Sequence, residues 1–529
     1  MFHCTYPLLL IMREIRVHPI DLLVGTFVLY QLLVANELTG IAVCDSIAWG
    51  LVYFAIRCIR HRYAWTKRWF IGAIISYGII QSFLAFLQIA GVIPTNHTLF
   101  ATTGSFSNPG PLGGCLAICL IITFSIWKNS NNERIGWLLL CSILFMGTAC
   151  IMTDSRAAWL AVFVGICWIQ FKHATQRMQK TMLGIIPILL VGTILLLYVY
   201  RPHSANGRLL IWKISTNIIA DSPILGHGTA SFPKEYLNYQ AEYFKNETYT
   251  QGEALLASDN TYAFNEGIRI MCEYGAIGLL LSLGICYSLF LLSKKARGAQ
   301  QAIIAALITY AVFSCFSYPT EVFPLKMIGS ILLGLSVPNI SGQLFRSKWM
   351  QLMLGVILLF VATVTVKGTF EQYRIKEVLA KYNIEENHDY VEYLTSNRCK
   401  YENNERILSL YAKILFDKGL YQECKPLLKK SIELLPTGEK YIDLGTINLY
   451  DGNIQEALTV FQEAAYRLPG HITPVYNLFT IYKGDNDTSD LATHYANKLV
   501  NMQVKKETRH TQNIRKEAAL YLQEHTQNH

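Results

Sequence analysis

The stretch from Ile185 to Tyr198 reads IIPILLVGTILLLY and contains no charged side chain. Runs of the same kind recur at residues 277–292 and 352–366. A transmembrane helix needs roughly 20 predominantly apolar residues, and each run reaches about that length with its flanks. The chain has 529 residues, of which 52% are hydrophobic and 16% charged, whereas soluble proteins usually carry about a quarter charged residues. We therefore predict a membrane protein.

Apolar segments recur along most of the chain. We predict eleven transmembrane helices, at residues 20–36, 42–57, 69–90, 110–127, 136–153, 157–171, 182–200, 267–293, 301–318, 324–340 and 350–367. Lys and Arg gather in alternate loops, which a positive-inside bias assigns to the cytoplasm. The same bias accounts for the net charge of +9, so we predict no nucleic-acid partner. A long loop at 201–266 and the C-terminus then lie outside the cytoplasm.

The C-terminal part contains an internal repeat. Gly419 to Glu423 recurs 33 residues later as Gly452 to Glu456. This unit resembles a tetratricopeptide repeat, in which paired helices stack on their neighbours. The predicted fold is therefore all-α, a polytopic bundle of about 11 transmembrane helices at residues 1–368 with a tetratricopeptide-like α-solenoid at 369–529. The repeats either offer a concave surface to a protein or glycan partner or stabilise the membrane domain.

Three motifs place charged side chains at outward ends of spans. Asp154 to Ala161 brings Arg156 to one such end, where pairing with Asp154 is the simple alternative to ligand binding. Gly207 to Gly228 opens the long loop and carries Arg208 and Trp212 on one helical face, four residues apart, followed by His227.

The third motif runs from Asn265 to Leu279 and closes the long loop. On a helix, Glu266, Arg269 and Glu273 share one face, so a self-satisfied ladder of ion pairs is the alternative to a functional site. The segment from Thr103 to Gly114 is too rich in Gly and Pro for a helix and predicts a turn at the membrane surface.

The order and placement of these motifs resemble the superfamily of O-antigen ligases, O-antigen polymerases and bacterial protein O-oligosaccharyltransferases. The resemblance covers roughly residues 20–340. It implies a multi-pass protein of the bacterial inner membrane, with the long loop and the C-terminal domain in the periplasm. It also implies an inverting, metal-independent transfer of a glycan from an undecaprenyl diphosphate carrier to the hydroxyl of an acceptor glycolipid, glycan or protein.

The resemblance suggests roles for individual residues. Arginine binds phosphate oxygens through parallel hydrogen bonds, so we expect Arg208, then Arg156 and Arg269, to bind the diphosphate. Many ligases of this family have a His immediately before the Asn of the third motif, where this chain has Phe264. Glu266 is the nearest replacement as general base, with Asp259 and His227 as alternatives. Asn265 and Trp212 are expected to support the site, Trp212 by packing or stacking.

The thirteen cysteines are scattered singly, without spacing typical of a metal site, so we predict neither metal nor cofactor. Two other classes of protein compete with the glycosyltransferase. A transporter or flippase of lipid-linked glycans predicts internal repeats among the spans and charges near the membrane midplane. A non-catalytic, membrane-anchored repeat scaffold leaves the shaped loop at 201–266 without a purpose.

Overall fold

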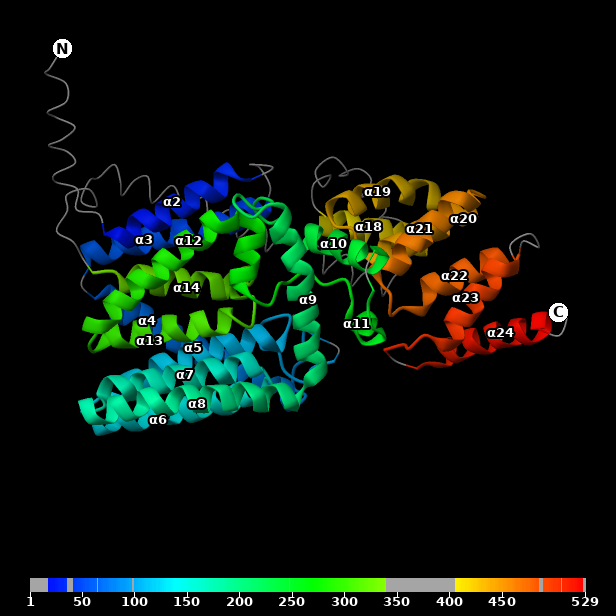
Figure 1. The fold of residues 1–529 in the computed structure, drawn as a ribbon. Coiled ribbons are helices and arrows are strands. Elements are labelled where there is room, and N and C mark those ends of the chain that lie inside the picture. The colour runs from blue at the N-terminus through cyan, green and yellow to red at the C-terminus, as the bar shows by residue number, and fades with distance from the viewer. Residues whose placement is uncertain are drawn as a thin grey trace, which may run out of the picture. The chain divides into compact units, whose positions relative to one another are not determined.

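A computed structural model describes residues 18–35, 41–63, 65–97, 99–246, 248–338, 405–484, 489–505 and 507–526. Within these ranges the regular secondary structure is entirely helical, which confirms the predicted all-α class. The chain divides into two compact units (Figure 1). The first consists of Met1–Pro202, Ser222–Ala230 and Ala263–Val366, and the second of His203–Asp221, Ser231–Tyr262 and Lys367–His529.

The first unit is a bundle of long apolar helices. They are α2 (Pro19–Leu33), α3 (Ile41–Arg62), α4 (Thr66–Ile89), α5 (Pro109–Lys128), α6 (Glu133–Met152), α7 (Arg156–His173), α8 (Gln176–Tyr200), α12 (Glu266–Lys295), α13 (Ala299–Ser314) and α14 (Phe323–Ser336). Ten of the eleven predicted spans thus coincide with helices. The eleventh, at 350–367, lies outside the described residues, as does the predicted domain boundary at 368.

Length and composition suit this bundle to a membrane. Among the described residues, α4, α5, α6, α8 and α12 are each long and apolar enough to cross one, and α2, α13 and α14 are shorter apolar helices. The other helices pack around α5, which contacts α4, α6, α7 and α13. Most side chains of α5 are buried. The chain is therefore a multi-pass membrane protein with a packed helical core.

One end of the bundle gathers several helix starts. A Cβ added to Gly113, near the start of α5, would lie 2.6 Å from the Cβ of Ser155, which precedes α7. The start of α12 hydrogen-bonds to the short 3-10 helix η1 (Pro319–Glu321) that precedes α14. Because successive helices run in opposite directions, these starts lie at the same end, which we call the Glu266 end.

The second unit combines helices of the long loop with the C-terminal helices. Its members are α9 (Pro202–Asp221), α10 (Phe232–Asn246), α11 (Gln251–Leu256), α18 (Glu405–Asp417), α19 (Tyr421–Leu434), α20 (Gly438–Tyr450), α21 (Ile454–Arg467), α22 (Ile472–Lys483), α23 (Ser489–Asn501) and α24 (Arg509–Thr526). Only the first residue of α9 belongs to the bundle.

The C-terminal helices follow the period of the sequence repeat. From α18 to α20 the first residue advances from 405 to 438, and from α19 to α21 from 421 to 454, which is 33 residues in both cases. Gly419 and Gly452 form equivalent turns with φ of +72° and +76°, a conformation that glycine adopts at little cost. The helices therefore repeat as pairs, while their tetratricopeptide assignment remains a prediction.

Candidate functional site

The start of α12 holds a buried pair of opposite charges. Asn265 caps the helix, because its side chain accepts a hydrogen bond from the amide of Ile268 at 3.1 Å. Glu266 is the first helical residue and is only 6% exposed. Its Oε2 lies 2.9 Å from Nε of Arg269, one turn further along. The structure thus brings three of the predicted site residues together at the Glu266 end.

Two further carboxylates surround the same arginine. Nη1 of Arg269 pairs with Glu273, and its Nε lies 3.2 Å from Oε1 of Glu321. The predicted ladder along α12 therefore forms, and Glu321 joins it from η1. The Glu321 side chain is 35% exposed, against 8% for Glu266 and 2% for Glu273. One guanidinium thus holds three carboxylates, of which only Glu321 has substantial contact with solvent.

Thr320 connects η1 to this cluster through both its backbone and its side chain. Its amide donates to Oε1 of Glu266 at 2.9 Å, and its Oγ1 accepts from Nη2 of Arg269 at 3.0 Å. Each oxygen of Glu266 therefore accepts one hydrogen bond and keeps a lone pair for another donor. Sequence reasoning assigned no role to Thr320 or Glu321, because 54 residues separate Thr320 from its partner Glu266.

Phe264 occupies the position where many ligases have histidine. Its backbone lies in the left-handed region, with φ of +52°, which is uncommon for a bulky residue. Its ring contacts that of Tyr318 edge to face, with centroids 5.2 Å apart. This ring contact adds to the hydrogen bonds between the start of α12 and η1, and it lies beside Asn265 and Glu266 in the sequence.

The second half of the Gly207 to Gly228 motif packs against a break in α12. At Gly275 the backbone leaves the helical region, with φ of +58°, and the segment Ser222–Ala230, which we call the strap, lies against the break. Four backbone hydrogen bonds join them: His227 N to Cys272 O at 2.9 Å, Gly228 N to Glu273 O at 2.9 Å, Ala276 N to Pro223 O at 2.9 Å and Ile277 N to Ile224 O at 3.4 Å. The strap therefore satisfies polar groups that a broken membrane helix would expose to lipid.

Arg156 lies at the end of another membrane helix. Its Nη1 donates to the carbonyls of Leu197 at 2.7 Å and Arg201 at 3.1 Å, so it caps the C-terminus of α8. Arg201 in turn pairs with Asp154, the residue that sequence reasoning offered as a partner of Arg156. The two bonds of Arg156 use two of its five N–H donors.

Arg208 and Trp212 belong to the second unit. Both are half-buried on α9, and their spacing of four residues puts them on one face. The next residue, Lys213, donates to Oη of Tyr243 at 2.6 Å and to Oε1 of Glu253 at 3.0 Å. These bonds, with Tyr243 first, raise the pKa of Lys213, and they attach α9 to α10 and α11.

Asp259 also lies in the second unit, where it caps a repeat helix. Its Oδ1 accepts from the amide of Gly438 at 2.7 Å and its Oδ2 from that of Glu439 at 3.4 Å, at the start of α20. Burial raises the pKa of Asp259, and the two amides partly oppose that shift. The contacts of Asp259 are those of a helix cap, whereas those of Glu266 belong to the charged cluster of α12.

The turn before α5 is held by two glutamines of α4. Oε1 of Gln88 accepts from the amides of Thr103 at 2.8 Å and Gly104 at 2.7 Å, and Gln81 bonds in the same way to Ser105 at 3.0 Å. Asn108 then caps α5 through the amide of Gly110 at 3.1 Å. The predicted Gly- and Pro-rich turn is therefore an ordered part of the Glu266 end.

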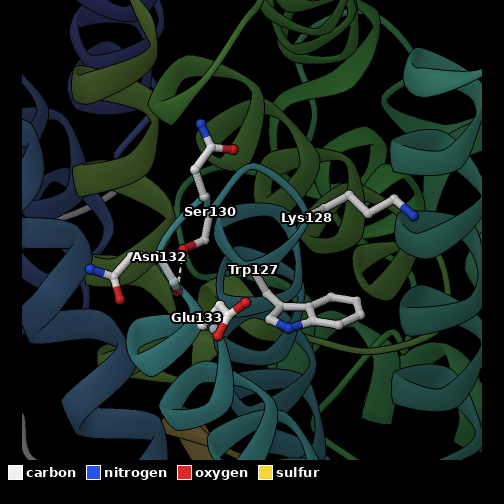
Figure 2. Close-up of a pocket in the computed structure, with 7 residues that line it drawn as sticks. Trp127, Lys128, Ser130, Asn132 and Glu133 are labelled. Carbon is white, nitrogen blue, oxygen red and sulfur yellow. Dashed lines mark hydrogen bonds between the residues drawn. The ribbon is translucent and has the colours of Figure 1, made fainter.

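A pocket of about 280 Å³ lies at the other end of α5. Figure 2 shows Trp127, Lys128, Ser130, Asn132 and Glu133 around the turn between α5 and α6. A helix of 20 residues spans about 30 Å, so this pocket is far from the start of α5 and from Glu266. We assign the candidate site to the Glu266 end, where the charged residues converge.

Comparisons with known proteins agree with the motifs. Residues 141–283 match the O-antigen ligase family, and this range contains Arg156, Arg208 and the cluster from Asn265 to Glu273. A search of curated proteins found no match. The match to this family supports a glycosyltransferase-type role in a membrane, with a lipid-linked glycan as the donor. The matched segment, its motifs and the helical bundle that carries them support a relationship of the chain to the O-antigen ligase superfamily.

Proposed function

We propose that this protein transfers a glycan from undecaprenyl diphosphate to an acceptor hydroxyl at the periplasmic side of the bacterial inner membrane. The observation that carries the proposal is the buried cluster of Glu266, Arg269 and Thr320, inside or beside the segment that matches the family. The cluster supplies the carboxylate of Glu266, which Arg269 and the amide of Thr320 orient by hydrogen bonds. This carboxylate keeps lone pairs that can accept a hydrogen bond from a third donor.

The proposed reaction is a single displacement. The acceptor oxygen forms a bond to the anomeric carbon of the glycan, while the bond from that carbon to the diphosphate oxygen breaks. The hydroxyl proton passes to Glu266, and the bond electrons leave with the diphosphate. Attack opposite the leaving group inverts the configuration of the anomeric carbon.

Arginine suits the leaving group, because a guanidinium stays protonated and binds phosphate oxygens without a metal. We assign the diphosphate first to Arg208 and then to Arg156, which retains three N–H donors beyond its bonds to α8. Arg269 is a weaker candidate, because its contacts with Glu266, Glu273 and Glu321 favour a role in orienting Glu266. We assign supporting roles to Trp212, which shares a face of α9 with Arg208, and to His227 and Asp259.

The test uses cells that lack the gene, complemented with the wild type or with Arg208→Lys, Arg208→Gln or Arg134→Gln. Arg134 is an exposed residue near the start of α6 and serves as the matched control. Lipopolysaccharide, capsule and glycoproteins are profiled in parallel with the lipid-linked donor. We expect Arg208→Gln to lower transfer about a hundredfold and to accumulate donor, because a leaving-group contact is lost, and Arg134→Gln to behave as wild type.

The profile also identifies the acceptor, because only the glycoconjugate made by this protein disappears. Glu266→Gln should abolish that product with normal protein levels, and Glu266→Asp should retain part of it, since a shorter carboxylate still accepts a proton. Unchanged glycans in the null strain, or full activity of Arg208→Gln, would contradict the proposal. Donor that accumulates on the cytoplasmic side alone would favour a flippase.

A further inference from the structure

The second unit fastens the long loop to the C-terminal repeats at several buried points. The principal one is Arg467, the last residue of α21, which is 6% exposed. Its Nη1 donates to the carbonyls of Leu237 at 3.2 Å and Pro436 at 2.9 Å, and its Nη2 to Oδ1 of Asn238 at 3.2 Å. One guanidinium thus joins α10 of the loop to α21 and to the connection between α19 and α20.

Gln240 makes the reciprocal connection from α10. Its side chain is fully buried, and its Nε2 donates to the carbonyls of Arg467 at 2.8 Å and Ser258 at 3.2 Å. Its Oε1 accepts from Oη of Tyr236 at 2.9 Å. A buried amide with these partners is satisfied only when α10 and α21 keep this register, because loss of one partner leaves a polar group without compensation.

The helix α11 and the segment after it provide further attachment points. Asp259 caps α20 through Gly438, and Lys505 donates to the carbonyl of Ala257 at 2.9 Å. A Cβ added to Gly470 would lie 2.7 Å from the carbonyl oxygen of Ala254, so the two backbones approach too closely for any other residue without rearrangement. The repeats therefore contact the loop from α10 to residue 259.

The same loop holds the helix that carries Arg208. Lys213 on α9 bonds to Tyr243 on α10 and to Glu253 on α11. Glu253 belongs to a capping box with Thr250, and the amide of Thr250 is the main cause that lowers the pKa of Glu253 to about 2. A continuous series of polar contacts thus runs from the repeats through α10 and α11 to α9.

We propose that the C-terminal repeats position the long loop for glycan transfer, with Arg467 as the positioning residue that fixes α10 and, through it, α9 with Arg208. This inference rests on the proposed transfer for its catalytic consequence, but its structural half stands independently. Of the two roles left open by the repeat pattern, it favours support, with the long loop as the supported element in place of the whole membrane domain.

The experiment compares full-length wild-type protein with Arg467→Met, Arg467→Lys and Arg509→Met in membranes. Arg509 is exposed at the start of α24 and gives a matched Arg-to-Met control. Two quantities are measured: the rate of tryptic cleavage after Lys234 and Lys245 on α10, and the KM and kcat of transfer from purified lipid-linked donor. Cleavage reports the opening of α10 without requiring activity.

We expect Arg467→Met to accelerate cleavage on α10 about tenfold or more and to raise the donor KM by a similar factor. We expect kcat to fall as well, because a misplaced Arg208 contacts both the bound donor and the departing diphosphate less well. Arg467→Lys keeps the positive charge but lacks the several N–H donors of a guanidinium. Its cleavage rate and KM should therefore lie between those of wild type and Arg467→Met. Arg509→Met should match wild type in both.

The two proposals fail in different ways. If Arg467→Met keeps wild-type cleavage, or if cleavage rises while KM stays unchanged, the positioning role is overturned. If wild-type protein transfers no lipid-linked glycan, the proposed function fails, and the cleavage rates still decide whether the repeats hold the loop. Should Arg467→Met fail to accumulate, Gln240→Leu removes the reciprocal contact and must give the same pair of changes.

Discussion

The amide of Gly228 donates a 2.9 Å hydrogen bond to the carbonyl of Glu273, the residue whose carboxylate holds Arg269. The strap is thereby joined to the same turn of α12 that presents the charged cluster. Tyr30 of α2 adds a contact to both partners, because its hydroxyl donates to the carbonyls of Leu225 in the strap at 3.0 Å and of Tyr274 in α12 at 3.2 Å. The geometry of the cluster therefore depends on the backbone of the strap.

Gly226→Ala tests this dependence. Gly226 has φ of +74°, and an added Cβ would lie 2.3 Å from the backbone carbonyl carbon of Glu273, which cannot move without breaking α12 further. Gly91→Ala is the matched control, because its φ is +72° with no atom within 4 Å of the added Cβ. We expect Gly91→Ala to cost about 1 kcal/mol of backbone strain and Gly226→Ala several times more.

The measurement is the thermal unfolding midpoint of detergent-solubilised protein, together with glycan transfer in membranes. Gly226→Ala should lower the unfolding midpoint much more than Gly91→Ala does. Because both glycines have a similar positive φ, the difference measures the steric clash alone. Equal shifts for the two variants would mean that the strap yields easily and does not fix the cluster.

Phe264→His tests the assignment of Glu266 as proton acceptor. Histidine adopts the left-handed conformation of this position more readily than phenylalanine, so the variant should fold. In the Glu266→Gln background we expect Phe264→His to restore part of the transfer, with activity that falls below about pH 6.5 as the imidazole becomes protonated. Phe264→Leu in the same background should restore none. Initial rates between pH 5.5 and 8 measure this directly, at about half-unit steps.

An absence of rescue with normal protein accumulation would place the proton acceptor elsewhere in the cluster. Glu321 would then be the next residue to replace, because its side chain is the most exposed of the three carboxylates around Arg269. Rescue by Phe264→Leu would instead show that ring removal, and not the imidazole, restores the site.

Most of the bundle could be predicted from the sequence, because burial in lipid is a local property of an apolar run about 20 residues long. The ladder of Glu266, Arg269 and Glu273 was also predictable, since helical periodicity alone puts these side chains on one face. The contribution of Thr320 was not, because it depends on how α13 returns the chain to the start of α12.

The roles of Asp259 and of the strap show the same limit. A carboxylate shortly before a functional motif suggests catalysis, yet Asp259 caps a helix that begins 179 residues later. The glycines at 226, 228 and 275 all have positive φ, a conformation that glycine adopts at little cost. The sequence alone could not pair the strap with the break in α12, because backbone hydrogen bonds leave no trace in residue types.

Asp259→Ala should loosen α20 without affecting the bundle. An N-terminal capping carboxylate contributes about 1 kcal/mol, so the free energy of opening of α20 should fall by roughly that amount. Thr437→Ala is the control, since the side chain of Thr437 makes no capping hydrogen bond although it occupies the cap position. Hydrogen exchange of peptides from α20 measures the opening. Faster exchange in Thr437→Ala, or unchanged exchange in Asp259→Ala, would contradict the capping role.

The stability of the repeats should depend on pH through Asp443. Burial raises the pKa of this carboxyl to about 6, although Lys413, with Nζ 3.6 Å from Oδ2, partly offsets the effect. An unfolded chain has an Asp pKa of about 3.9, so the native state binds the proton more tightly. The free energy of opening therefore falls as the pH rises from about 4 through about 6, by about 3 kcal/mol.

Asp443→Asn removes the titration and should flatten this part of the profile. Hydrogen exchange of α18 and α20 between pH 4 and 7, corrected for the intrinsic exchange rate, gives the opening free energy of both variants at about half-unit intervals. As the pH rises, the free energy of opening of wild type should fall relative to that of Asp443→Asn, because a neutral amide avoids the burial of a charge. A difference that is constant over this range would show that Asp443 titrates as an ordinary surface carboxylate and that Lys413 fully compensates its burial.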